Sequence, residues 1–165
     1  MLQNHLHHST EDHISILISF WERLHQVKQL SFHAESKSKE IIEWAGKGNG
    51  SVIIAKENDN TLIFNEKGSW LNSHGTEFIF SNILRWTLDP QERVISLEHL
   101  RRGVNHPVFL VDLAPSSKHS LTSLDSHLCG ADTYFGQLHL DNHCLRLNWR
   151  VIGPKKNEEI DYFYS

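Results

Sequence analysis

The stretch Leu145-Arg-Leu-Asn-Trp-Arg-Val-Ile152 decides the fold class of this 165-residue chain. Apolar and polar residues alternate in it, so the two leucines, Trp149 and Val151 would share one face of an extended strand, and the two arginines and Asn148 the other. Alternation with a period of two is typical of a strand with one buried and one exposed face. The stretch therefore predicts a β-strand in the wall of a sheet whose inner face is apolar.

Similar short runs, rich in Ile, Val, Phe, Tyr and Trp, fill the chain from about residue 30 onward. Clusters of turn-forming residues separate several of them, at 46–50, 57–60, 67–68 and 89–90. Consecutive strands joined by short turns favour an antiparallel meander, which must close or fold on itself to protect its edges. We expect a mostly β fold, an antiparallel up-and-down β-barrel, with a β-sandwich as the alternative. The expected strands are 30–36, 39–45, 51–57, 61–67, 76–88, 93–101, 107–114, 120–139 (two strands or one bent strand), 144–152 and 159–164.

One helix is expected, ahead of the first strand. Apolar residues recur at helical spacing between Ile14 and Leu24, and Ser9 and Thr10 provide capping oxygens before them. We expect this helix to pack against one end of the barrel. The expected boundaries are a disordered, histidine-containing tail at 1–8, the helix at about 11–27, and a single domain at 9–165.

The composition argues against several classes of protein. Acidic residues (20) outnumber basic ones (16), which gives a formal net charge of −4 and a pI near 6.3, so no nucleic-acid partner is expected. The sequence has no apolar run of about 18 residues and no signal-peptide pattern, so no membrane partner is expected. Two cysteines make no disulfide framework and favour a cytoplasmic location. The 13 histidines make the net charge strongly dependent on pH near neutrality.

Several polar residues fall on the apolar faces of the expected strands. Glu66 shares a face with the apolar residues of its strand, and Asn82 does so on the next strand, together with Trp86. His99 and Arg101 follow the same pattern one strand later. A buried polar group without a partner costs roughly 1–3 kcal/mol, so these residues need either a network, such as Glu66 with Arg101, or a wet cavity. The set favours a partly polar pocket inside the barrel, with a structural network as the alternative.

The stretch His127-Leu-Cys-Gly-Ala-Asp-Thr-Tyr-Phe-Gly136 holds the densest group of reactive side chains. His127 and Cys129 lie two residues apart, as do Asp132 and Tyr134, but the spacing of three between the two pairs would place them on opposite faces. A bulge with one extra residue after Cys129 would bring all four to one face. We therefore expect an imidazole, a thiol, a carboxylate and a phenol in one line.

Three kinds of site are compatible with this cluster. Together with His139 or His143 it offers nitrogen, sulfur and oxygen ligands for a metal, but the spacing matches no familiar zinc pattern. Cys129 beside His127 has the residue types of a nucleophile and its base. The same side chains could instead bind a small polar or aromatic ligand, or be structural, with the thiol buried and Asp132 stabilising the bulge. We assign no metal ligand and no catalytic residue here.

The segment Gly153-Pro-Lys-Lys156 directly follows the expected strand that ends at Ile152. Proline cannot donate to a strand ladder, so Pro154 should end that strand and place the two lysines at the rim of the barrel. There Lys156 would attract an anionic group of a ligand. The alternative is a solvated turn whose charges only improve solubility.

The C-terminal half resembles a family of uncharacterised bacterial and fungal proteins. The most specific motifs are His127-x-Cys-x-x-Asp-x-Tyr-x-Gly136 and Trp149-x-Val-x-Gly-Pro-x-Lys156, followed by Tyr162-x-Tyr164. Earlier segments are also similar, namely Gly48-x-Gly50, Phe64-x-Glu66-x-Gly68 and Asn82-x-Leu84-x-Trp86, so the resemblance covers about 40–164. It implies a lipocalin-like (calycin-like) β-barrel that binds a small molecule. The chain departs from the family in having no histidine at 109–110 and in having Asn82 in place of an arginine.

We therefore expect a protein that binds a small, partly apolar molecule inside the barrel, with no cofactor identified. One alternative is an enzyme, or a protein that handles a chromophore or cofactor, using His127, Cys129 and Asp132. Another is a protein-interaction module, for example a homodimer. The expected ligand-binding residues are Glu66, Trp86, His99, Arg101, His127, Cys129, Asp132, Tyr134, Trp149 and Lys156.

Overall fold

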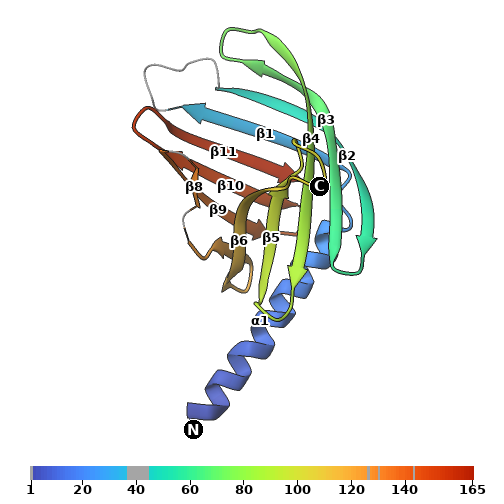
Figure 1. Ribbon diagram of the computed structural model, residues 1–165, viewed down its shortest axis with the longest axis vertical. Helices are drawn as coiled ribbons and strands as arrows, with labels where there is room; N and C mark the ends of the chain where they lie inside the picture. Colours follow the sequence, from blue (N-terminus) through green and yellow to red (C-terminus); the bar gives the residue numbers. More distant parts are fainter. Residues whose placement is uncertain (1, 37–44, 126, 130, 143) are drawn as a thin grey trace.

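The computed structural model describes residues 2–36, 45–125, 127–129, 131–142 and 144–165, with the backbone alone for 2–11 and 127–129. In this part of the chain one helix precedes a series of strands (Figure 1). The elements are α1 (Leu2–Leu24), β1 (Gln29–Ser36), β2 (Gly46–Asn58), β3 (Thr61–Asn72), β4 (Glu77–Asp89), β5 (Val94–His99), β6 (Val108–Ser117), β7 (Ser120–Ser123), β8 (His127–Cys129), β9 (Asp132–Leu140), β10 (Leu145–Ile152) and β11 (Asn157–Tyr164).

The sheet closes on itself as an antiparallel up-and-down barrel. Each strand from β1 to β6 pairs with the next one along the chain, β7 pairs with β9, and β11 pairs with both β10 and β1. The pairing of β9 with β10, from Leu140↔Leu145 to Thr133↔Ile152, completes the ring. Ten of the eleven described strands form the barrel, while the short β8 pairs only with β9. The expected barrel is confirmed, and the sandwich alternative is wrong.

Helix α1 closes one end of the barrel and extends away from it, as Figure 1 shows. Its last two turns bury Leu17, Phe20, Trp21 and Leu24. The helix starts at Leu2, so the expected start near residue 11 is wrong, while the expected disorder of the tail at 1–8 stays a prediction. The segment from Leu2 to Leu24 contains neither glycine nor proline, so nothing in it stops the helix from continuing past the capping residues. No helix in the described residues is long and apolar enough to cross a membrane.

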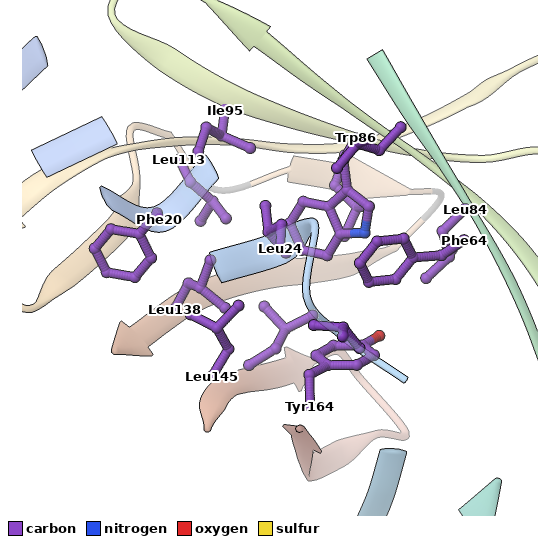
Figure 2. Packing of buried hydrophobic residues seen from close by; sticks show 14 of the residues in the cluster. Phe20, Leu24, Phe64, Leu84, Trp86, Ile95, Leu113, Leu138, Leu145 and Tyr164 are labelled. Atoms are coloured by element: carbon purple, nitrogen blue, oxygen red, sulfur yellow. The ribbon is translucent and has the colours of Figure 1, made fainter. Parts of the chain in front are cut away.

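The core lies in the half of the barrel next to α1. Phe20 and Leu24 insert between inward-facing residues of opposite walls, including Ile95, Leu113 and Leu138 (Figure 2). Both helix residues are 0% exposed, and the burial of each such side chain stabilises the fold by roughly 1.5–3 kcal/mol. The barrel therefore has a packed end at α1. We call the opposite end, where β1 ends at Ser36, the far end.

Two glycine-containing segments that were expected to be turns are strands instead. Residues 46–50 begin β2, and residues 67–68 lie inside β3, so both strands are longer than expected. The reason is steric, because aromatic rings of neighbouring strands occupy the space that a side chain would need at Gly46, Gly48 and Gly68. The expected strand at 39–45 falls almost entirely on residues outside the described part, whereas the turns at 59–60 and 90–93 are present.

The segment 120–139 folds differently from a bent or bulged strand. β8 runs antiparallel to β9, with Cys129 opposite Asp132 and His127 opposite Tyr134, so the chain reverses between Cys129 and Asp132. The expected bulge within one strand is wrong, because Cys129 and Asp132 belong to two different strands that pair antiparallel. The four residues form two register pairs across these strands rather than following one line.

Candidate functional site

The far half of the barrel contains a cavity of about 170 Å³ that opens to solvent. Four strands form its wall, β1 and β11 on one side and β3 and β4 on the other. Aromatic rings and aliphatic side chains make up most of its surface, with an amide and two carboxylates among them. The lining residues are Phe32, Ala34, Glu35, Trp70, Phe80, Asn82, Glu158, Ile160 and Tyr162.

The aromatic rings around the cavity contact one another. Phe32 packs edge-on against Phe80, with 5.5 Å between the ring centroids, and lies at the same distance from Tyr162. Trp70 stacks on Phe78 with 4.8 Å between centroids. Such contacts stabilise ring positions beyond the area that they bury. The cavity therefore has a largely preformed aromatic wall.

Glycines on the inner face of β2 and β3 make room for these rings. Gly46, Gly48 and Gly50 alternate along β2 on the same face as the buried Val52. A Cβ atom on Gly48 would lie 2.5 Å from Cζ of Phe32 and 2.7 Å from Cβ of Trp70. The stripe of glycines thus gives space to side chains from neighbouring strands, which explains why a turn-like composition forms a strand here.

A buried carboxyl group lies next to the cavity, on the side of the packed core. Glu66 on β3 is 1% exposed and pairs in register with Asn82, which lines the cavity. The hydroxyl of Tyr164 donates a 2.7 Å hydrogen bond to Oε2 of Glu66. Its other oxygen, Oε1, is buried and has no hydrogen-bond partner among the described residues. A buried carboxyl group therefore lies directly behind the polar part of the cavity wall, next to the amide of Asn82.

The electrostatics of this region follow from burial. Burial raises the pKa of Glu66 to about 7, although the hydrogen bond from Tyr164 and the neighbouring Asn82 oppose the shift. Burial, with the nearby Glu66 carboxylate, raises the pKa of Tyr162 to about 12 and raises the pKa of Tyr164 as well. Both phenols are therefore neutral hydrogen-bonding groups near pH 7. Glu66 is the group in this region that changes its charge close to neutrality.

The sequence-predicted site residues on β4 and β5 lie apart from this cavity. Trp86 is completely buried in the apolar core, and its Nε1 has no hydrogen-bond partner among the described residues. His99 ends β5 half-buried, and its Nδ1 accepts a 2.9 Å hydrogen bond from the backbone N–H of Arg101. Arg101 is exposed in the turn that follows, so the expected pairing of Glu66 with Arg101 is wrong. Strand alternation stops predicting orientation once the strand has ended.

The C-terminal candidates lie at the far end, mostly on β9 and β10. Asp132 pairs with Lys156 across 3.4 Å, so this lysine has a protein carboxylate as its partner. Tyr134 is half-buried opposite Val151, and Trp149 lies opposite Gly136. A ligand-binding role for these residues stays a prediction. The side chains of His127 and Cys129 lie outside the described part, so the same holds for them.

The structure brings together residues that the sequence argument did not select as a site. Of the inward polar residues, only Asn82 lines the cavity, and Glu66 lies behind it. The aromatic residues Phe32, Phe80 and Tyr162 come from different strands and were missed. The alternating glycines of β2 could have indicated these residues. Inward positions without side chains leave space that large side chains from neighbouring strands fill. Among the described residues, no group of three or more His, Cys, Asp or Glu side chains is arranged to hold a metal.

Comparison with known families supports the resemblance seen in the C-terminal motifs. A family model described as "Family of unknown function (DUF6314)" matches residues 36–165. The chain therefore belongs to this family of unknown function. The matched region contains β2 to β11, but neither α1 nor most of β1. No curated protein and no solved structure matches the chain.

Proposed function

We propose that this member of the family binds a small, largely apolar molecule in the cavity at the far end of the barrel. The observation that carries the proposal is the cavity itself, about 170 Å³ with an aromatic wall and a single amide, that of Asn82. Ligand sites in proteins are usually concave, mostly apolar and provided with a few polar groups that fix orientation. An engineered apolar cavity of roughly 150 Å³ binds benzene, so this volume suits a ring-sized group.

The organisation of the barrel supports this function. The packed end at α1 supplies the stability, because its core contains most of the buried apolar residues. The far half keeps inward-facing glycines where a packed barrel would have aliphatic side chains. Rings from neighbouring strands fill the space at these glycines, so the glycines shape the aromatic wall of the cavity without lining it themselves. Small barrels of this kind can hold one small ligand in their interior.

A cavity-filling substitution tests the proposal. Ala34 lines the cavity from β1, so Ala34→Phe should occupy it and prevent binding. The matched control is Ser31→Phe, which adds the same ring on the exposed outer face of the same strand. The measurement is native mass spectrometry of each protein purified from its own host, followed by titration with 2-phenylethanol monitored by calorimetry. We expect binding to the wild-type protein and to S31F, and none to A34F.

Two outcomes would contradict the proposal. Equal binding to A34F and wild type would place any ligand outside the cavity. A wild-type protein that carries no small molecule from its host, and binds none of a panel of ring-sized compounds, would show that the cavity is not a binding site. Circular dichroism and urea unfolding of A34F establish that a loss of binding does not come from a loss of the fold.

A further inference from the structure

The charged residues that line the cavity are all acidic. Glu35 and Glu158 line it, and none of the nine described lining residues is a lysine, an arginine or a histidine. The carboxyl group of Glu66 lies behind Asn82 as a third acidic group. Glu35 is 60% exposed on the outer face of β1, at the edge of the cavity, whereas Glu158 shares the inward face of β11 with Tyr162. Carboxylates without a lining cation create a negative potential there, which favours positively charged ligands.

The aromatic wall also favours positively charged ligands. Phe32, Phe80 and Tyr162 carry negative charge density on their ring faces, and a cation placed over such a face gains roughly 0.5–2 kcal/mol. Proteins that bind quaternary ammonium groups use cages of aromatic rings for this purpose. The rings and the acids here line one cavity of about 170 Å³, so a ligand of ring size would contact both.

We propose that the cavity selects a small organic cation, an ammonium group carried on an apolar or aromatic body, over neutral and anionic molecules of the same size. This inference rests on the proposed function and adds the charge of the ligand to it. The ammonium group would lie among the rings and the carboxylates, where Asn82 offers its side-chain oxygen. The apolar body would fill the rest of the aromatic wall.

Other charged groups near these carboxylates limit how strongly the carboxylates attract a cationic ligand. Lys156 pairs with Asp132 at 3.4 Å and also interacts with Glu158, and the Nε2 atom of His33 lies 3.7 Å from Oε1 of Glu35. The groups that face Glu66 are neutral near pH 7, namely Asn82 and the two phenols of β11. Amine binding should weaken as the pH falls below about 7, because Glu66 then takes up a proton and loses its negative charge.

Three compounds that share one ring separate charge from shape. Phenethylamine is cationic at pH 7, 2-phenylethanol is neutral and phenylacetate is anionic, and each is titrated into the intact wild-type protein by calorimetry. We expect the amine to bind about tenfold more tightly than the alcohol, and the acid to bind most weakly. The variants Glu158→Gln and Glu35→Gln should each lower amine affinity several-fold, and by more than they lower the affinity for the alcohol.

The matched control is Glu92→Gln, which makes the same change in net charge in the exposed turn between β4 and β5, at the opposite end of the barrel. An equal loss of amine affinity in E92Q and E158Q would mean that net charge alone is responsible, and would overturn the inference. Amine binding no tighter than alcohol binding, or absent up to about 10 mM, would also overturn it. Alcohol binding that A34F abolishes would still support the proposed function, so the two failures can be told apart.

Discussion

At the scale of single residues, Glu66 is the side chain whose charge the fold controls most strongly. Its folded pKa of about 7 lies above the ordinary value of 4.5 because burial disfavours the carboxylate. Between these two pH values the unfolded chain releases the proton while the folded protein keeps it, so stability falls as the pH rises and then levels off. Each pKa unit corresponds to about 1.4 kcal/mol, which gives a total loss of roughly 3 kcal/mol.

The variant Glu66→Gln should remove this pH dependence. A glutamine keeps the shape of the side chain and still accepts the hydrogen bond from Tyr164. Urea unfolding at about pH 5 and about pH 8 should therefore show similar stabilities for E66Q and wild type at the lower pH, and E66Q more stable by roughly 3 kcal/mol at the higher. Parallel stability profiles for the two proteins would show that Glu66 is ionised in the fold well below pH 7. Glu92→Gln, in an exposed turn, is the control for a general charge effect.

Residue orientation could be predicted from the sequence only where a strand continues. Alternation correctly placed Glu66 and Asn82 on the inner face, because both lie within long regular strands. It failed for Arg101, because β5 ends at His99 after a register irregularity between Leu97 and Glu98. The partner of Glu66 could not be predicted at all, since Tyr164 is 98 residues away and meets it only through closure of the barrel.

At the scale of elements, the opening of β2 shows why composition alone misled. Glycines at 46, 48 and 50 are typical of a turn when their neighbours in sequence are considered, and here they face rings from other strands. Their alternation, one residue in two, is the strand period itself. The same argument applies to Gly68 on β3, where a Cβ atom would lie 2.8 Å from Cζ of Phe80. Which rings contact these glycines depends on which strands pair with one another. A local sequence pattern does not contain that information.

The variant Gly48→Ala tests this steric account of β2. The added methyl group would overlap the ring of Phe32 and the Cβ atom of Trp70, so both side chains must shift. Overpacking of this kind typically costs about 1–3 kcal/mol, and displacement of Phe32 should also weaken ligand binding in the cavity. Lys47→Ala, on the exposed face of the same strand, should change stability by less than about 0.5 kcal/mol. Urea unfolding of both variants is the measurement, and equal stabilities would contradict the account.

At the scale of the whole molecule, the barrel is divided along its axis into a packed half next to α1 and a far half that contains the cavity. The half next to α1 contains the apolar cluster, including Phe20, Leu24 and Trp86 at 0% exposure. The far half contains the cavity, the glycines of β2 and the carboxylates. The strands run continuously through both halves, so the barrel closure that α1 stabilises also positions the rings around the cavity (Figure 1).

This division predicts a gradient in amide hydrogen exchange along single strands. Local opening costs least where few apolar contacts are buried, so amides of β3 and β4 near the cavity should exchange faster than amides of the same strands near α1. In exchange followed by mass spectrometry, peptides covering 68–72 and 78–80 should therefore lose protection before those covering 61–64 and 84–88. Bound phenethylamine should slow exchange in the first pair and leave the second unchanged. Uniform protection along both strands would show that the barrel opens only as one unit, and would contradict the division.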